Sequence, residues 1–421
     1  MNSISNKLSF IRKLKNKIFP FYKKKEVKKL FSYINDRNSQ NQKVAMFVGG
    51  CVRKFLSNEE IDDIDIATIF TPEQLKERFN KSPIKIVDTG LEHGSITAIV
   101  DKIKFELTTL RKDLKTDGRH AEIEYTDDWK IDSDRRDFTI NAIYLDENGN
   151  LFDPQLGTKD LERGIVKFIG DPEKRIEEDY LRIIRLLRFV LQYKSNIDES
   201  TLRAVKTKLN GINKLSKERI LKELIKIIEL DNFKFINNYK NLIHIFNLIF
   251  PELKHYRRLV KLSEIDNYFQ LNSTSSLALL LIDNSNNYEY FCHKYKVSNN
   301  LKNRLKNIFI CFNETKFDKN FFSKNLKKSL YLYSYEILKD AFLINYTDKK
   351  NSNSDYFLSH LKKLENTKRP VFPYNGRYLK KKGLTEGKNF GLILKSIEEL
   401  WLKKNFNLLD EEVLEIINKH R

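Results

Sequence analysis

Short runs of apolar residues in the first 170 positions predict strands separated by helices. Strand patterns, either alternating or wholly apolar, cover residues 43–48, 64–69, 84–88, 95–100 and 103–108. Between them, residues 52–56 and 71–79 have helical patterns, and Pro72 follows Thr71 at a favourable first helical position. The front of the chain is therefore expected to fold as a mixed sheet with helices.

After about residue 170 the apolar residues recur every three or four positions, which is the spacing of one helix face. Residues 175–193, 199–209 and 217–229 have this spacing, and most of the following chain continues it. Clusters of Asn, Ser and Lys at 284–287 and 348–354 interrupt the pattern and are candidate linkers. The predicted fold class is α+β, with a mixed head followed by an all-α remainder.

The charge of the chain points to a polyanionic partner. Its 421 residues contain 77 Lys and Arg against 57 Asp and Glu, a net charge of +20. A surplus of this size favours nucleic acid, although a general bias towards Lys and Asn would produce the same number. The longest wholly apolar run, Leu277–Ile282, is too short to cross a bilayer, so no membrane partner is expected.

The cysteines and the basic amino-terminal segment indicate the compartment. Cys51, Cys292 and Cys311 lie far apart and lack metal-binding spacing, which favours a reducing compartment over a disulfide framework. Met1–Lys25 has no continuous apolar core, so it is not a secretory signal. It is rich in Lys rather than Arg and Ser, which favours a leading helix over a targeting peptide. The expected location is the cytoplasm, with an organellar matrix left open.

Two carboxylates and a pair of glycines predict a site for a metal ion and a nucleotide. Residues two apart in a strand share a face, so Asp63 and Asp65 point the same way. Adjacent carboxylates suit Mg²⁺, which prefers a few carboxylates together with phosphate oxygens. Upstream, Gly49 and Gly50 let the backbone approach a phosphate, and Arg53 adds a positive charge.

Two further groups are candidates for the same site. Glu106 lies between apolar neighbours in a strand, where it is either a third acidic group or an edge-strand carboxylate facing water. Arg135 and Arg136 are followed by Asp137, an acid that can hold one guanidinium in place for bidentate phosphate binding. The alternative for this second group is a helix start with surface ion pairs.

The segment Glu178–Phe189 combines an acid with evenly spaced arginines. On a helix, Asp179, Arg182 and Arg185 form one ridge, and Arg188 drifts to its edge. Cytosine and adenine each present an amine donor beside a ring-nitrogen acceptor, so an Asp–Arg pair would accept them and refuse uracil and guanine. The alternative is an ordinary ion pair on a solvated helix. In the next helix, Glu218 or Arg219 is a candidate brace for this one.

The order of these motifs resembles that of a known family. GGCVR, DIDIAT, HGSITA, FELTTLR, TDGRHAEIEYTDDW, RRDFTINAI, EDYLRIIRLLRF and SKERILKEL occur in sequence. They are similar to the motifs of class II tRNA nucleotidyltransferases, the CCA-adding enzymes, and of their relatives the bacterial poly(A) polymerases. The resemblance covers about residues 44–225, and residues 373–406 resemble the family's tail weakly.

The resemblance implies a division into domains. It comprises a helical extension (1–42), a nucleotidyltransferase head (43–168), a helical neck that recognises the base (169–232), a helical body (233–345) and a helical tail that binds tRNA (346–421). It also implies that the chain adds C, C and A to the 3′ end of tRNA from CTP and ATP, using two Mg²⁺ ions. The expected partner is tRNA, held at its acceptor stem and elbow, and no stable protein partner is implied.

Residue roles follow by matching the motifs. The resemblance implies that Asp63 and Asp65 bind Mg²⁺. It implies that Gly50, Arg53 and Arg136 contact the nucleotide, largely through its phosphates, and that Asp179 and Arg182 read the base edge with Arg185 and Arg188 in support. Asp117, Gly118 and Arg119 correspond to a flexible loop of full CCA-adding members, in a stretch too polar to build a core.

One position departs from the family, and other activities of the same fold stay open. Lys54 stands where the family usually has Asp, so the partner that orients Arg53 is missing or Asp62 takes its place. The alternatives to complete CCA addition are a poly(A) polymerase, a partial CC- or A-adding enzyme, and an RNA-binding protein without activity. The last is disfavoured because both metal carboxylates are present.

Overall fold

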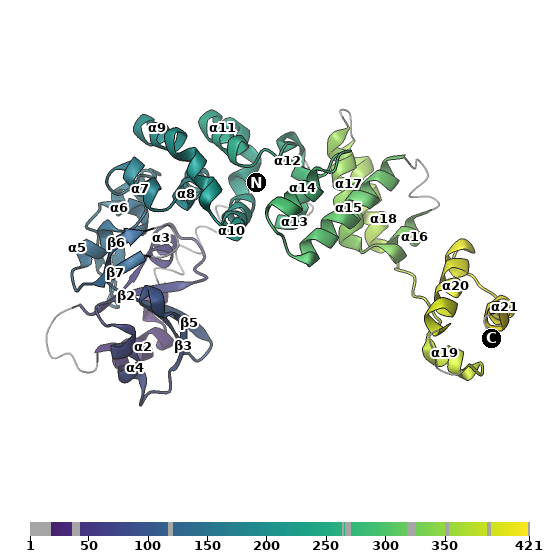
Figure 1. Cartoon of the computed structure of the whole chain (residues 1–421), viewed down its shortest axis with the longest axis horizontal. Helices are drawn as coiled ribbons and strands as arrows, with labels where there is room; N and C mark the ends of the chain where they lie inside the picture. The colour runs from purple at the N-terminus through teal and green to yellow at the C-terminus, as the bar shows by residue number, and fades with distance from the viewer. Residues whose placement is uncertain are drawn as a thin grey trace. The chain divides into compact units, whose positions relative to one another are not determined.

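The computed structural model describes most of the chain and divides it into two compact units. The described residues are 18–35, 43–116, 121–262, 265, 271–317, 325–349, 353–384 and 389–419. The units are Met1–Ile249 and Phe250–Arg421, purple to teal and green to yellow in Figure 1. The boundary falls in neither candidate linker, and the finer division into head, neck, body and tail stays a prediction.

A seven-stranded sheet forms the centre of the first unit, in the order β3-β4-β5-β2-β1-β8-β9. Its strands are β1 (Ala45–Val48), β2 (Ile64–Thr68), β3 (Lys85–Gly90), β4 (Ser95–Val100), β5 (Ile103–Thr109), β8 (Tyr144–Leu145) and β9 (Leu151–Phe152). Only the β2–β5 pair is parallel, and it sets Asp65 beside Glu106. A separate hairpin consists of β6 (Arg111–Thr116) and β7 (Ala121–Tyr125).

Helices surround and extend this sheet. They are α2 (Lys25–Asn35), α3 (Gly50–Leu56), α4 (Pro72–Phe79), α5 (Trp129–Asp134), α6 (Gly157–Glu162), α7 (Pro172–Glu178), α8 (Leu181–Tyr193), α9 (Glu199–Lys208), α10 (Lys217–Ile228) and α11 (Lys240–Ile249). One face of α2 is buried in the head core, where Phe31 packs against Phe47 with ring centroids 5.2 Å apart. As predicted, Thr71 caps α4 and Pro72 opens it.

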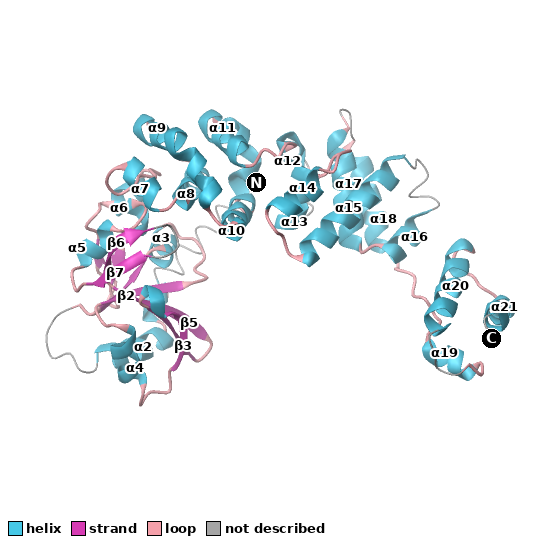
Figure 2. Ribbon diagram, viewed as in Figure 1, coloured by secondary structure: helices cyan, strands magenta, loops and turns pink. Residues whose placement is uncertain are grey.

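In the described part of the second unit, helices joined by loops are the only regular secondary structure (Figure 2). Its helices are α12 (Tyr256–Leu262), α13 (Ser273–Leu281), α14 (Asn287–Lys294), α15 (Asn299–Phe317), α16 (Leu326–Leu332), α17 (Tyr335–Asp348), α18 (Ser354–Asn366), α19 (Gly376–Lys381), α20 (Asn389–Lys403) and α21 (Asp410–Lys419). The predicted α+β class, with a mixed head and an all-α remainder, is confirmed. No described helix is long and apolar enough to cross a membrane.

The helix expected over 175–193 is two helices. α7 ends at Glu178 and α8 begins at Leu181, because Asp179 has an extended backbone with φ −154°. The Asp179 carboxylate accepts a hydrogen bond from the backbone N–H of Leu181 at 3.1 Å, as a capping residue does. An apolar spacing of three and four continues across such a short break, so the periodicity alone predicted a single helix.

Candidate active site

Asp63 and Asp65 line one cavity, as their spacing predicted. Asp65 lies in β2 and Asp63 just precedes the strand. The cavity, called the Asp63 cavity below, has a volume of about 440 Å³. Its walls also include Gly49, Gly50, Arg53, Lys54, Arg136, Asp137, Asn141, Arg185, Arg188, Phe189 and Lys226. Residues from the sheet, from α3 and from α8 and α10 are thus brought together.

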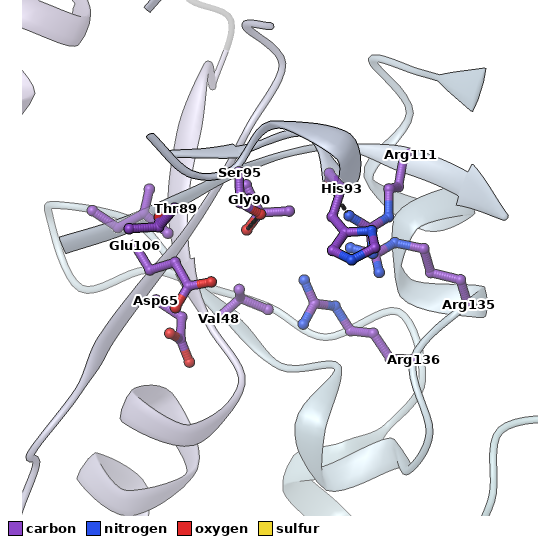
Figure 3. Close-up of a pocket in the computed structure, with 12 residues that line it drawn as sticks. Val48, Asp65, Thr89, Gly90, His93, Ser95, Glu106, Arg111, Arg135 and Arg136 are labelled. Carbon is purple, nitrogen blue, oxygen red and sulfur yellow. Dashed lines mark hydrogen bonds between the residues drawn. The ribbon is translucent and has the colours of Figure 1, made fainter. Parts of the chain in front are cut away.

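A second cavity adjoins the first at Asp65. It has a volume of about 480 Å³ and is called the Glu106 cavity. Figure 3 shows Asp65 and Glu106 at one end, and His93, Arg111, Arg135 and Arg136 at the other. Asp65 and Arg136 belong to both cavities, so they form a shared wall.

Glu106 lies in an interior strand, not at a sheet edge. β5 pairs with β4 on one side and β2 on the other, and Glu106 is in register with Asp65. Burial and the neighbouring Glu106 carboxylate raise the pKa of Asp65 to about 6. A pair of crowded carboxylates is the environment that a divalent cation relieves, because its charge offsets their repulsion.

The donor set fits an ion that also binds substrate phosphates. Among the described residues, no three His, Cys, Asp or Glu side chains converge into a complete metal-binding group. Asp63 and Asp65 therefore supply only part of a coordination shell. Mg²⁺ is commonly bound by one or two carboxylates together with phosphate oxygens and water, so these residues suit Mg²⁺ better than an ion enclosed by protein.

Gly49 keeps the space beside Asp65 open. Its φ is +73°, a conformation that favours glycine. A Cβ atom there would lie 3.8 Å from both Asp65 Oδ2 and Arg136 Nη1, and so would occupy the cavity between an acid and a guanidinium. The backbone at Gly49 thus lies beside Asp65 and Arg136, and its approach to a phosphate stays a prediction.

Arg53 is buried but held by neutral groups. Its Nε donates to the Tyr193 hydroxyl at 2.9 Å, its Nη1 donates to Asn141 Oδ1, and its guanidinium lies 4.7 Å from the centroid of the Phe189 ring. Lys54 instead forms an ion pair with Asp62. Asp62 therefore does not take the orienting role that the sequence left open for it.

The acid that fixes the Arg135–Arg136 pair is Asp132, not Asp137. Asp132 is fully buried; it accepts from Arg135 Nε at 2.8 Å and from Arg136 Nη2 at 2.9 Å. Tyr144 supports this arrangement, since its hydroxyl donates to Asp132 Oδ2 at 2.7 Å. Positions three and four residues apart meet on a helix, so this spacing was a signal that the sequence interpretation missed.

Asp137 connects the head to α8 instead. Its Oδ2 accepts from Arg185 Nε at 2.7 Å, and its Oδ1 accepts from Asn141 Nδ2 at 2.8 Å. Asn141 lies in a short 3₁₀ turn, so this segment is not the helix start considered as an alternative. Arg53, Asn141, Asp137 and Arg185 thereby form a continuous chain of hydrogen bonds along the wall of the Asp63 cavity.

The residues predicted to read the base and those predicted to support them lie in different places. The supporting Arg185 and Arg188 line the Asp63 cavity. Asp179 and Arg182 are not among its described lining residues: Asp179 accepts from Arg219 Nη2 at 2.7 Å, and Arg182 forms an ion pair with Glu178. Arg219 is thus in contact with the segment it was expected to brace.

Sequence reasoning missed two residues of α10. Glu223 is 4% exposed and accepts from Arg188 Nε at 2.8 Å and from Lys226 Nζ at 3.1 Å. Lys226 itself lines the Asp63 cavity. Their spacing of three residues is that of an ordinary ion pair on a helix face, and the distant partner Arg188 is not indicated by it.

The predicted flexible loop lies outside the described residues. Asp117, Gly118 and Arg119 fall between β6 and β7, whose strands are described on either side. Arg111 at the start of this hairpin lines the Glu106 cavity and donates to Asp113 Oδ1 at 3.2 Å.

Parts of the chain match known family models, and known proteins are similar to most of its length. Residues 45–167 match the family described as the poly A polymerase head domain, and residues 196–257 match a probable RNA and SrmB-binding site of polymerase A. The human mitochondrial CCA tRNA nucleotidyltransferase 1 is 32% identical, over 88% of this chain and 86% of its own length. A CCA-adding enzyme of Streptococcus uberis is 30% identical, over 84% of this chain and 87% of its own length.

Solved structures agree with the fold. The Bacillus stearothermophilus CCA-adding enzyme in complex with CTP superposes with a TM-score of 0.64 at 20% identity, covering 94% of this chain and 98% of that one. A Thermotoga maritima CCA-adding enzyme complexed with tRNA gives a TM-score of 0.60 at 21% identity, covering 99% and 98%. These likenesses extend over both units of the chain.

Proposed function

Because this chain belongs to the family of CCA-adding tRNA nucleotidyltransferases, as its motifs indicated, we propose that it adds C, C and A to the 3′ end of tRNA without a template, from CTP and ATP, with release of pyrophosphate. The observation that carries the proposal is the Asp63 cavity. It joins the two carboxylates of the head to Arg185 and Arg188 of α8 in one space.

The triphosphate of the incoming nucleotide is assigned to the head side of the Asp63 cavity. Arg53 and Arg136 are held in place there by their neighbours, so their guanidiniums lose little freedom when they bind phosphate. Gly49 contributes an open approach for the phosphates. Mg²⁺ ions held by Asp63 and Asp65 would neutralise the triphosphate and lower the pKa of the RNA 3′-hydroxyl.

The 3′-terminal nucleotide of the RNA is assigned to the Glu106 cavity. In-line displacement requires the attacking oxygen and the leaving pyrophosphate to lie on opposite sides of the α-phosphate. Two cavities that meet at Asp65 and Arg136 support an assignment of the hydroxyl to one and the triphosphate to the other. Arg111, Arg135 and His93 at the far end would bind the phosphates behind the terminal nucleotide (Figure 3).

Base selection is assigned to α8 and the residues just before it. Arg185 and Arg188 line the cavity, Arg182 lies one turn before Arg185, and Asp179 just precedes the helix. Asp179 is paired with Arg219 and Arg182 with Glu178, and neither residue is among the described residues that line the cavity. Reading of the base edge requires both side chains to reach the cavity. Nucleotide binding is therefore expected to rearrange these ion pairs.

The tRNA is expected to bind through phosphate charge and shape along the basic chain. The net charge of +20 suits a polyanion, and double-stranded RNA offers few base edges to side chains.

The cytoplasmic location expected from the sequence stays a prediction, as does an organellar alternative.

The test is the sequence of the product. A tRNA transcript lacking its terminal CCA is incubated with the protein, Mg²⁺ and all four nucleoside triphosphates, and the 3′ ends are sequenced. We expect C, C and A in that order, followed by termination. A long A tract would instead identify a poly(A) polymerase, and addition of CC or A alone would identify a partial enzyme.

A further inference from the structure

Arg53 is oriented by a hydrogen-bonded chain that reaches outside the Asp63 cavity. Its Nε donates to the Tyr193 hydroxyl at 2.9 Å, and this hydroxyl donates to Glu59 Oε1 at 3.2 Å. Gln192 secures the far end by donating from Nε2 to Glu59 Oε2 at 2.9 Å. The chain links α3, the loop after it and the last turn of α8.

The hydrogen bonds of this chain can run in only one direction, from Arg53 through Tyr193 to Glu59. Burial raises the pKa of Tyr193 to about 12, so its phenol is neutral and has a single proton. The Glu59 carboxylate can only accept, so the Tyr193 hydroxyl donates its hydrogen bond to Glu59. The oxygen lone pairs of Tyr193 are then left to face Arg53, whose Nε can only donate. Each member thus fixes the orientation of the next.

The remaining contacts of Arg53 leave one nitrogen available to a ligand. Nη1 donates to Asn141 and the Phe189 ring lies beside the guanidinium plane. Among the residues that the structure describes, no acceptor takes a hydrogen bond from Nη2. The neighbouring Lys54 is turned to Asp62, so it does not help to orient the guanidinium.

We propose that Tyr193, held by Glu59, is a positioning residue that aims the Arg53 guanidinium at the triphosphate of the incoming nucleotide. This inference rests on the proposed function, in which Arg53 binds that triphosphate. Tyr193 and Glu59 supply the orientation that an acid at position 54 would otherwise give. They act on the phosphates and not on the base, so their effect is the same for CTP and ATP.

The test compares nucleotide binding by variants of the full-length chain, in the presence of Mg²⁺ and without RNA. Tyr193→Phe removes the hydroxyl and keeps the ring, which stacks on Phe189 with centroids 6.4 Å apart. We expect its Kd to rise about three- to tenfold for both CTP and ATP, the effect of losing one hydrogen bond to a charged group, with Kd for CMP unchanged. In primer extension, KM should rise by the same factor while kcat changes less than about twofold.

A double-mutant cycle separates positioning from a general structural role. Because Tyr193 acts through Arg53, Tyr193→Phe should weaken CTP binding no further in an Arg53→Ala background. Glu59→Ala should reproduce the loss seen with Tyr193→Phe. The matched control is Glu60→Ala, which makes the same charge change one residue away, at an exposed position, and should leave Kd unchanged.

The outcomes distinguish this inference from the function on which it rests. If Arg53→Ala weakens CTP binding but Tyr193→Phe does not, the positioning role is overturned and the proposed function stands. Additive effects of the two substitutions, or equal losses for CTP and CMP, also overturn it. If Arg53→Ala itself leaves CTP binding unchanged, both the phosphate role of Arg53 and the positioning role fail.

Discussion

Three aspartates in the head show how neighbouring charges decide the state of a buried carboxyl group. Burial and the nearby Glu106 carboxylate raise the pKa of Asp65. Burial would also raise the pKa values of Asp132 and Asp137, but Arg136 and Arg135 around the first, and Arg185 beside the second, hold these pKa values well below the ordinary range. At Asp65 the positive charges of Arg136 and Arg53 do not offset burial and the acidic neighbours, and this is an environment that a bound cation would relieve.

Substituting Asp65 tests its assignment as a metal ligand. Asp65→Asn keeps the shape of the side chain and removes its charge, so nucleotide incorporation should fall about a hundredfold or more. The measurement is single-turnover addition to a tRNA transcript lacking CCA, at saturating CTP and Mg²⁺. Asp88→Asn, an exposed carboxylate that pairs with Lys76, is the matched control and should retain the rate. A wild-type rate for Asp65→Asn would refute the assignment.

Asp132 should make the stability of the head depend on pH. Its pKa is lower in the folded state than in the unfolded chain, so its stabilising effect is complete above the unfolded pKa of about 4 and is lost as the pH falls towards the folded pKa. Asp132→Asn should lower the free energy of unfolding by about 3 kcal/mol near neutral pH, because Arg135 and Arg136 lose their buried partner.

Urea unfolding across the acidic range checks this prediction. The wild-type protein should lose stability steadily between about pH 5 and about pH 3. The Asp132→Asn curve should be flatter, so the two should converge at the acidic end. Parallel curves would mean that Asp132 has the same pKa in both states.

At the level of elements, the sequence predicted what local patterns encode and missed what depends on distant partners. The strand with Asp65 and the Thr71–Pro72 helix start both follow from neighbouring residues, and both are found, although Asp63 lies just before the strand rather than in it. The break at Asp179 was missed because the apolar spacing continues across it, and the contact of Asp179 with Arg219, 40 residues away, has no local signal. The partner of Arg53 was missed for the same reason, because Tyr193 lies 140 residues along the chain.

The buried acid Glu223 of α10 forms an ion pair with Arg188 of α8 and so links the two helices. Glu223 accepts from both Arg188 and Lys226, so Glu223→Ala should leave two cations without their partner and reduce the free energy of unfolding by about 3 kcal/mol. Glu218→Ala is an exposed change on the same helix and should cost less than about 0.5 kcal/mol. Equal losses in urea unfolding would show that the Glu223 pairs contribute nothing specific.

The turn that carries Asn141 requires a glycine in its neighbour. A Cβ atom at Gly157, the first residue of α6, would lie 2.1 Å from the Thr139 carbonyl oxygen. Gly157→Ala should therefore force α6 away from this turn and lower the melting temperature of the protein by several degrees, roughly the effect of 1–3 kcal/mol. Gly391→Ala, inside α20 with no atom within 4 Å of its Cβ, should not lower it.

At the scale of the whole molecule, family and fold class were accessible from the sequence because the motifs lie in order along one segment. The boundary between the two units was not, because no cluster of Pro, Gly or Ser marks position 249. The expected tRNA contacts of the second unit are also beyond sequence reasoning. A basic helical surface has no fixed motif, since phosphate charge is recognised by any suitably placed Lys or Arg.

The charge of the molecule predicts a steep effect of salt on RNA binding. If about six phosphates are neutralised, the affinity for tRNA should fall about a thousandfold between about 50 and 200 mM salt. The affinity for free CTP should fall far less, because it carries fewer charges into a cavity with fixed guanidiniums. Filter binding of labelled tRNA at several salt concentrations gives the slope. A shallow slope would mean that the basic surplus is not used to bind RNA.

The wall shared by the two cavities has a kinetic consequence. Under the proposed assignment, each addition leaves the new terminal nucleotide on the triphosphate side of Asp65 and Arg136. Before the next nucleotide can enter, the strand must step back past that wall by one position. The rates of the three additions then depend on this translocation. Tighter binding of the RNA end by Arg111 and Arg135 would lengthen the pauses between additions.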